Sequence, residues 1–308
     1  MKIMVFDVGG TEIKYSVMDD AMNRYESGSI PTPSDSQPHF LETLAQLYRP
    51  HRDEVDGIAL SLPGFIDAEH GVVRGGGAPS IIYNIGTPVG PRLAELCGCK
   101  VWIENDGKAA AIAELQRGAL QGCSNAAVFV IGTGVGGGII ANGQLVRGVH
   151  FTAGEYSFVN TNAEAWDAPD QNMACQCSTS NLLKWYRARK ALPEDAPLDG
   201  RSFFAAANAG EPEALEVLRR VCHAVAVQIY NLTVLLDVEK VAIGGGISKQ
   251  PLLLESLRSA YNGLYASRAG QAYMEGLPRC QIVPCAFSSE ANQVGVAAAY
   301  FEAMQKKR

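Results

Sequence analysis

Short apolar segments along the chain alternate with longer amphipathic ones, and the same order of segments occurs twice. The first half predicts strands over residues 3–6, 12–18, 56–62 and 100–104 and helices over residues 37–50, 89–97 and 106–119. The second half predicts strands over residues 126–131, 139–141, 144–146, 240–243 and 280–284 and helices over residues 211–236, 251–264 and 291–304. This repeat predicts a duplicated α/β fold, in which residues 162–180 form an irregular loop.

Each half opens on a hairpin whose tip is rich in glycine. The tips carry Gly9, Gly10 and Thr11 in the first half and Gly132, Thr133, Gly134 and Gly136 in the second. The second tip matches the Gly-x-Gly-x-x-Gly pattern of dinucleotide sites, but a strand follows it where that pattern requires a helix. A single tip is explained equally well as a tight turn. Two tips at matching places favour phosphate binding, because glycine exposes backbone N–H groups and has no side chain to block the phosphate.

Residues near these tips fit a nucleotide site. Lys14 can bring a positive charge back to the first tip, and the Asp7 carboxylate can hold Mg²⁺ directly or through water. Gly245 and Gly246 end a predicted strand before a predicted helix, which suits an adenosine lying across the start of that helix.

Asn105 and Asp106 stand between a predicted strand and a predicted helix. Taken alone, the pair favours ordinary helix capping. Capping by Asn105 and a catalytic role for Asp106 can coexist, since the helix dipole favours the ionised form of a carboxylate at a helix start.

Composition narrows the possible functions. The chain has 308 residues, of which 47% are hydrophobic and 19% are charged, as is usual for a soluble globular protein. Its formal net charge of −6 argues against binding to nucleic acid or to a membrane surface, both of which need a basic face. The first residues are predicted as a strand rather than a signal peptide, and no apolar run reaches the roughly 18 residues of a membrane span. The eight cysteines are therefore expected to be reduced thiols in a cytoplasmic protein.

In their order along the chain, the motifs resemble those of the ROK family (repressors, open reading frames and sugar kinases), a branch of the actin-like ATPase superfamily. They are Asp7-Val8-Gly9-Gly10-Thr11-x-x-Lys14, Pro63-Gly64, Glu104-Asn105-Asp106, Gly132-Thr133-Gly134-x-Gly136-Gly137, Gly154-Glu155 and Gly244-Gly245-Gly246. The resemblance covers essentially the whole chain, and the combination is far more specific than any one glycine motif.

The resemblance implies an ATP-dependent sugar kinase with the actin-like, ribonuclease H-like fold, whose two lobes close over a sugar and Mg-ATP in a cleft between them. It implies that the first two glycine tips bind phosphates and that the third glycine run binds adenosine. Asp106 aligns with the catalytic base of the family, and Gly64, Asn105 and Glu155 align with its sugar ligands. Gly76 lies in a glycine stretch that resembles the β-glucoside kinases of the family, and we assign it to the substrate site as well.

The expected lobes comprise residues 1–113 and 114–290, and a helix over residues 291–308 is expected to pack back on the first lobe. A homodimer is implied by the resemblance alone.

The chain departs from the family at a structural zinc site. Most members bind zinc through one histidine after the Gly-Glu motif and three cysteines in a later loop, which also carries a sugar-binding glutamate. In this chain Phe158 stands at the histidine position, Leu182 at the third cysteine position and Lys184 at the glutamate position, so Cys175 and Cys177 remain. A closed structural zinc site needs four protein ligands. We therefore expect no zinc, and we expect apolar packing by Phe158 and Leu182 in its place.

Loss of the family's zinc-bound histidine and loop glutamate would open the pocket near the anomeric carbon of the sugar. With an aromatic residue at the histidine position, the chain resembles the zinc-free β-glucoside kinases of the family. This resemblance implies phosphorylation of the 6-hydroxyl of a glucose unit in a β-glucoside such as cellobiose, with Asp106 as the base. Free glucose, N-acetylmannosamine and fructose stay open as substrates.

Two functions of other classes were weighed against the kinase. A repressor is disfavoured because the first hairpin starts at residue 3 and leaves no room for a preceding DNA-binding helix-turn-helix. A sugar sensor without catalysis is disfavoured by the presence of Asp106, Lys14 and both glycine tips.

Overall fold

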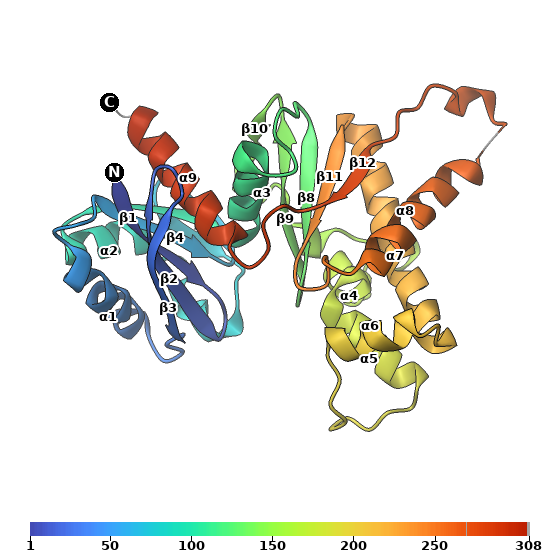
Figure 1. The fold of residues 1–308 in the computed structure, drawn as a ribbon, viewed down its shortest axis with the longest axis horizontal. Coiled ribbons are helices and arrows are strands. Elements are labelled where there is room, and N and C mark those ends of the chain that lie inside the picture. Colours follow the sequence, from blue (N-terminus) through green and yellow to red (C-terminus); the bar gives the residue numbers. More distant parts are fainter. Residues whose placement is uncertain (269, 307–308) are drawn as a thin grey trace. The chain divides into compact units, whose positions relative to one another are not determined.

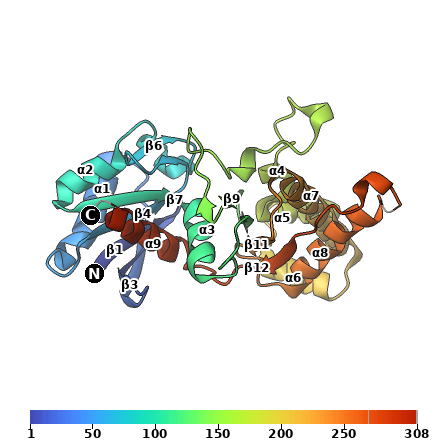
Figure 2. The ribbon, with the colours of Figure 1, turned by 90° about the horizontal axis from the view of Figure 1, so that it is seen from above.

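The computed structural model describes residues 1–268 and 270–306, and the chain divides into two units (Figures 1 and 2). The first unit comprises Met1–Arg117, Leu145–Gly154 and Glu290–Arg308, and the second comprises Gly118–Gln144 and Glu155–Ser289. This division differs from the expected one in two places. The boundary expected after residue 113 falls inside a helix, and residues 145–154, expected in the second lobe, belong to the first unit.

The first unit is built on a five-stranded sheet with strand order β3-β2-β1-β4-β7. Strand β1 is antiparallel to β2 and parallel to β4, which in turn is parallel to β7. The elements of this unit are β1 Lys2–Val8, β2 Glu12–Asp19, β3 Arg24–Pro31, α1 Gln37–Tyr48, β4 Gly57–Leu62, β5 Phe65–Asp67, β6 Val72–Gly75, α2 Val89–Cys97, β7 Lys100–Asn105, α3 Asp106–Arg117 and α9 Ala291–Lys306.

Both faces of this sheet are covered by helices, so residues 3–6 of β1 and 57–60 of β4 are buried and apolar on both faces. Met4 and Phe6 of β1 point into one core with the apolar residues of α1 and α2. Ile3 and Val5 alternate with them and are also fully buried, on the face that α9 covers. Helix α9 packs on α3 as well as on β1, β4 and β7, so the end of the chain completes the first unit.

The second unit repeats this sheet with strand order β10-β9-β8-β11-β12. Strand β8 is antiparallel to β9 and parallel to β11, which is parallel to β12. The predicted duplication is therefore confirmed. The elements of this part of the chain are β8 Ala126–Ile131, β9 Val135–Ala141, β10 Gln144–Leu145, α4 Met173–Cys177, α5 Thr179–Arg189, α6 Gly200–Asn208, α7 Pro212–Leu236, β11 Lys240–Gly244, α8 Pro251–Ala266 and β12 Gln281–Pro284.

Several elements differ from the sequence prediction. Strand β3 was not predicted, because it is an edge strand whose side chains are mostly exposed and polar. Helix α4 and the start of α5 lie in the segment predicted as an irregular loop. Helix α8 begins at Pro251, as predicted, and ends at Ala266, two residues later than predicted.

Strand β9 begins at Val135, so Gly136 and Gly137 lie in a strand rather than in the predicted turn. A Cβ on Gly137 would lie 1.8 Å from the carbonyl oxygen of Val128 and 2.8 Å from the ring of Tyr156. Glycine in this strand therefore permits close approach of a neighbouring backbone and ring, which is a common reason for glycine inside a sheet.

Among the described residues, no helix combines the length and the apolar character that a membrane crossing requires.

The contact between α3 and α9 gives a stability prediction. A Cβ on Gly295 of α9 would lie 1.7 Å from the carbonyl oxygen of Ala109 in α3. Gly295→Ala must push the two helices apart, so we expect it to lower the free energy of unfolding by about 1–3 kcal/mol in denaturant titrations.

Gly263→Ala in α8 is the matched control, because a Cβ there meets no atom within 4 Å. It should raise the free energy of unfolding by about 0.5–1 kcal/mol through helix propensity. Equal effects of the two substitutions would contradict the tight helix contact.

Candidate functional site

Asn105, the last residue of β7, joins a loop to a helix in the first unit. Its side chain is only 4% exposed. Its Nδ2 donates to the carbonyl oxygen of Gly64 at 2.9 Å, and its Oδ1 accepts from the backbone N–H of Lys108 at 2.9 Å. Asn105 therefore caps α3, as predicted, and holds the loop after β4 at the same time.

Asp106 is the first residue of α3 and is half-buried. Its Oδ1 accepts from the backbone N–H of Gly107 at 2.8 Å. Because the first turn of a helix carries partial positive charge, this position suits a carboxylate. The cap made by Asn105 thus leaves Asp106 at the helix start with its carboxylate in the first turn.

The loops of Gly64 and Gly76 pack backbone against backbone. Gly64 has φ +117°, and a Cβ there would lie 2.7 Å from the carbonyl oxygen of Gly75. Gly76 has φ +65°, and a Cβ there would lie 3.4 Å from the Cα of Gly64. The structure therefore brings Gly64, Gly76 and Asn105 together in the first unit.

The first glycine tip is held in place through its carbonyl groups. The N–H of Gly9 closes the turn by donating to the carbonyl oxygen of Glu12 at 2.9 Å. The hydroxyl of Thr32 donates to Gly9 O at 2.9 Å, and the hydroxyl of Ser80 donates to Gly10 O. These hydroxyls fix the backbone of the turn.

Asp7 lies beside this tip on β1, directly opposite Lys14 on β2. Asn292, at the start of α9, donates its Nδ2 to Asp7 Oδ1 at 3.0 Å. Burial raises the pKa of Asp7 above its ordinary value, and the hydrogen bond from Asn292 and the charge of Lys14 oppose this only in part. Asn292 was missed by sequence reasoning, because nothing in a local pattern connects two residues 285 positions apart.

A pocket of about 450 Å³ lies in the second unit, beside the second glycine tip. Its walls come from that tip, from the starts of α5 and α6 and from the turn after β11. The lining residues are Gly132, Thr133, Thr179, Ser180, Leu183, Asp199, Gly200, Arg201, Gly246, Ile247 and Gln250. Helix starts favour anions, so this pocket is chemically suited to a phosphate-bearing ligand.

Three of the predicted ATP-binding residues, Gly132, Thr133 and Gly246, line this pocket together. Gly245 lies next to it with φ +96°, and a Cβ there would lie 2.1 Å from the carbonyl oxygen of Ile131 at the end of β8. The backbone of the third glycine run thus passes directly against the second tip.

Gly134 and Gly136 are placed differently. A Cβ on Gly134 would lie 2.8 Å from Ser157 Oγ, and Gly136 is paired with Val130 inside the sheet. The pocket walls from α5 and α6 were not found from the sequence, because α5 begins inside the segment predicted as a loop and no helix was predicted over α6.

Glu155 is half-buried and immediately precedes a short 3₁₀ turn over Tyr156–Phe158. Tyr156 is buried, stacks on Phe129 with ring centroids 4.1 Å apart and donates its hydroxyl to Gly138 O at 3.2 Å. Ser157 Oγ accepts from the N–H of Val135 at 2.9 Å. The turn that carries Glu155 is therefore fixed to the β8–β9 hairpin.

Phe158 was expected to pack in place of a zinc ligand, and this expectation is wrong. Its side chain is 67% exposed. Leu182, in contrast, is fully buried in the core of the second unit, as expected. The difference follows from the turn: Tyr156 takes the interior position, and Phe158 is left at the surface.

The two remaining cysteines also lie in different surroundings. Cys177 is fully buried in the apolar core, and burial raises the pKa of its thiol to about 12. Cys175 is only half-buried. Metal binding needs thiolates, which the surroundings of Cys177 disfavour. Across residues 1–268 and 270–306, no three His, Cys, Asp or Glu side chains gather in a way that could hold a metal ion.

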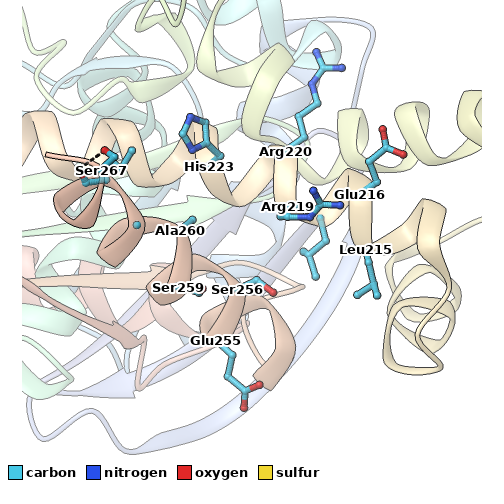
Figure 3. A pocket seen from close by; sticks show the side chains of 13 residues that line it. Leu215, Glu216, Arg219, Arg220, His223, Glu255, Ser256, Ser259, Ala260 and Ser267 are labelled. Atoms are coloured by element: carbon cyan, nitrogen blue, oxygen red, sulfur yellow. Dashed lines mark hydrogen bonds between the residues drawn. The ribbon is translucent and has the colours of Figure 1, made fainter. Parts of the chain in front are cut away.

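A second, larger groove of about 1000 Å³ lies between α7 and α8 (Figure 3). Its lining includes charged side chains such as Glu216, Arg219 and Glu255, together with serine and leucine side chains and His223. Among the described residues that line it, none belongs to the predicted site.

The electrostatics of Asp7 predict an unusual effect on stability. Because its pKa is raised in the folded state, the folded protein binds more protons than the unfolded chain just above the ordinary pKa, and stability falls as pH rises through that window. At neutral pH the ionised group therefore costs stability. We expect Asp7→Asn to raise the melting temperature at pH 7 in metal-free buffer, with a gain that shrinks toward acid pH.

Asp19→Asn is the control of opposite sign. Hydrogen bonds, above all from the Asn23 side chain, lower the pKa of Asp19 to about 2, so its ionised form adds stability at neutral pH. That substitution should lower the melting temperature at pH 7, and the loss should fade as pH falls toward 2. A lower melting temperature for both variants at pH 7 would contradict the assignment for Asp7.

Comparison with known proteins places these sites in a family. A β-glucoside kinase from Klebsiella pneumoniae is 31% identical over 261 residues, which cover 84% of this chain and 86% of the relative. An N-acetyl-D-glucosamine kinase from Vibrio atlanticus is 30% identical over 275 residues, covering 82% of this chain and 86% of the relative. The crystal structure of a ROK family protein from Streptococcus pneumoniae in complex with sucrose superposes with a TM-score of 0.86 at 28% identity, covering 99% of this chain and all of that one.

The curated relatives are sugar kinases, and this chain shares their class of reaction, ATP-dependent phosphoryl transfer to a carbohydrate. Its duplicated sheet is that of the actin-like ATPase fold found in its structural neighbours. The ROK family model matches residues 3–305, and the chain belongs to the ROK family.

Proposed function

We propose that this kinase transfers the γ-phosphate of Mg-ATP to the 6-hydroxyl of a glucose unit in a β-glucoside such as cellobiose. The observation that carries the proposal is the arrangement around Asn105. The buried Asn105 side chain caps α3, whose first residue is Asp106. The same side chain holds the Gly64 loop, which we assign to sugar binding. A proton acceptor and a sugar-binding loop are thereby fixed to each other.

Phosphoryl transfer to a hydroxyl requires positioning, neutralisation of phosphate charge and an acceptor for the hydroxyl proton. Asp106 is the proposed acceptor. A carboxylate is a weak base, which is sufficient where the transition state is loose and the proton leaves late. Gly64, Gly76, Asn105 and Glu155 are the proposed sugar ligands.

The nucleotide roles are assigned to the glycine tips. Gly132, Thr133 and Gly246 are proposed to bind ATP because they line one pocket with the starts of two helices. We propose that further residues of both units bind the nucleotide as well. They are Gly134, Gly136 and Gly245 in the second unit and Gly9, Gly10, Thr11 and Lys14 in the first.

The surroundings of Asp7 fit magnesium. Its carboxylate is a hard oxygen ligand, and Asn292 orients it through a single oxygen, Oδ1. Bound Mg²⁺ would neutralise charge on the phosphates. We propose no zinc, because one of the two remaining cysteines is buried as a neutral thiol in the core.

A β-glucoside is favoured over a free monosaccharide by the residues near Glu155. The turn after Glu155 exposes the ring of Phe158 where most family members carry a zinc-binding histidine. An exposed aromatic ring three residues after the proposed sugar ligand Glu155 is suited to stack on the face of a second sugar or an aglycone. The sucrose bound to the Streptococcus pneumoniae relative shows that a disaccharide binds to a protein of this fold.

N-acetylglucosamine is the second candidate, because the relative from Vibrio atlanticus is nearly as similar as the β-glucoside kinase. Glucose, N-acetylmannosamine and fructose remain alternative substrates. A homodimer stays a prediction from the family resemblance.

A panel of sugars tests the reaction. With ATP and Mg²⁺, the purified protein should release ADP fastest with cellobiose or gentiobiose, compared with glucose, N-acetylglucosamine, N-acetylmannosamine and fructose, and the product should carry phosphate at the 6-position by NMR. Asp106→Asn keeps an oxygen for the N–H of Gly107 but removes the base, so kcat should fall about 10²- to 10⁴-fold.

Asp53→Ala is the control, because its side chain is 89% exposed and lies outside the proposed site. It should keep the wild-type rate. If no sugar in the panel drives ADP release, the kinase proposal fails, and an unchanged rate in Asp106→Asn would remove Asp106 from the mechanism.

Phe158 gives a separate prediction on specificity. Loss of an aromatic contact worth about 0.5–1.5 kcal/mol should lower kcat/KM for cellobiose roughly 2- to 12-fold in Phe158→Ala. The value for glucose should stay near wild type, because glucose lacks the second sugar.

Trp166→Ala is the matched control, since Trp166 is 76% exposed in the same stretch of chain. It should leave both values unchanged, and Phe158→Tyr should retain the preference for cellobiose. Equal losses for cellobiose and glucose in Phe158→Ala would argue against stacking on the second sugar.

A further inference from the structure

Glu104 and Arg147 form an ion pair in the first unit, immediately before Asn105. The side chain of Glu104 is completely buried, and that of Arg147 is 31% exposed. Glu104 Oε2 accepts from Arg147 Nη2 at 2.7 Å and from Nε at 3.2 Å. Glu104 Oε1 accepts from the backbone N–H of Asn105 at 3.1 Å. One buried carboxylate thus connects Arg147 to the backbone of Asn105.

Arg147 also begins a loop that ends at Gly154, next to Glu155. The N–H of Ala153 donates to the carbonyl oxygen of Arg147 at 3.3 Å and closes this loop. Gly148, Phe151 and Gly154 have φ values of +76°, +60° and +79°, which fold the loop tightly. The backbone of Arg147 therefore closes the loop, while its side chain ties the loop to the end of β7.

The ion pair between Arg147 and Glu104 connects two segments of the chain as well as neutralising the buried charge of Glu104. A buried ion pair contributes little to stability compared with apolar side chains of similar volume, because both charges lose their hydration. The pair joins two segments that carry proposed sugar ligands on either side: Asn105 follows Glu104 directly, and Glu155 follows the loop of Arg147. A substitution of Arg147 would therefore alter the positions of both segments.

We infer that Arg147, acting through Glu104, is a positioning residue for phosphoryl transfer. It fixes the orientation of Asn105, and with it the start of α3 that carries Asp106, and it fixes the loop that leads to Glu155. The inference rests on the proposed function, since it assigns Arg147 a role in the same site. Arg147 itself is not proposed to touch the sugar or the nucleotide.

The test uses a pair of substitutions that keeps the fold. Arg147→Met alone leaves a buried charge without its partner and endangers folding. The double variant Glu104→Gln/Arg147→Met removes both charges and retains a side-chain oxygen for the N–H of Asn105. We expect it to unfold at a denaturant concentration close to that of wild type, with kcat on the best sugar lowered about 10- to 100-fold and KM for ATP unchanged.

Two further variants separate positioning from direct action. Arg147→Lys keeps a positive charge without the fork geometry of arginine, so its kcat should fall between wild type and the double variant. If the pair acts as a unit, Glu104→Gln alone should lower kcat as much as the double variant does. Wild-type kcat in Glu104→Gln together with a large loss in Arg147→Met would overturn the inference, because Arg147 would then act on the substrate directly.

The matched control is the exposed ion pair of Arg189 and Glu216 in the second unit, with side chains 57% and 48% exposed. Glu216→Gln/Arg189→Met should keep wild-type kcat. A folded Glu104→Gln/Arg147→Met variant with wild-type kcat would overturn the inference.

Amide hydrogen exchange distinguishes this inference from the proposed function. The double variant should exchange faster than wild type over residues 147–155 and 104–108. If wild type phosphorylates no sugar of the panel, the proposed function fails. If both segments of the double variant exchange at the wild-type rate, Arg147 does not hold them in place. The inference is then overturned, whichever sugars the wild-type protein phosphorylates.

Discussion

The side chain of Asn105 is the constraint on which the proposed sugar site depends. Its amide oxygen caps α3, and its amide nitrogen donates to the carbonyl oxygen of Gly64 and so holds the Gly64 loop. A helix that starts at a strand end needs a cap in any case, since its first N–H groups have no partners within the helix. Because the cap is also bonded to a loop, the direction of α3 and the position of the loop are set by one side chain. Glycine at positions 64 and 76 then lets two loop backbones approach more closely than side chains would allow.

Two acidic side chains of the first unit, Glu104 and Asp7, differ in how far their charge is compensated by neighbouring groups. Glu104 is fully buried and is neutralised by Arg147, so it acts as a fixed structural element. Asp7 is half-buried, and the hydrogen bond from Asn292 and the charge of Lys14 only partly offset the hydration that its carboxylate loses, so its pKa is raised. A carboxylate that has few hydrogen-bond donors or cations beside it in the protein retains a strong tendency to bind a cation. Such a residue lowers stability but serves function, which is a common compromise at functional sites. The two acids thus differ in role because their partners differ.

The sequence predicted the sheets and the polar residues at strand ends well, because both follow from short-range patterns. The alternation and apolar runs around Phe6, Leu60 and Val128 define central strands, and glycine clusters mark the hairpins. The Asn105 cap was predicted because capping depends on neighbours a few residues apart.

Other features were not predicted, because they depend on contacts that are distant in the sequence. The bond between Asn292 and Asp7 joins the two ends of the chain, and the bond between Arg147 and Glu104 joins two segments that were expected in different lobes. Phe158 was predicted to be buried because it is apolar, but Tyr156 occupies the interior position of the same turn. Strand β3 lies at a sheet edge, where one row of backbone groups and most side chains face solvent, so its pattern is mostly polar.

The order in which the chain builds its first unit has a consequence for synthesis. The sheet of this unit comes from the start of the chain, but α9 comes from its end and supplies Asn292 to Asp7. A ribosome makes the second unit before it makes α9, so the first unit stays incomplete until α9 has been made. The nascent chain therefore holds Asp7 without the amide that orients it. Loss of α9 would therefore remove that amide and also expose the residues of β1, β4 and β7 on which α9 packs.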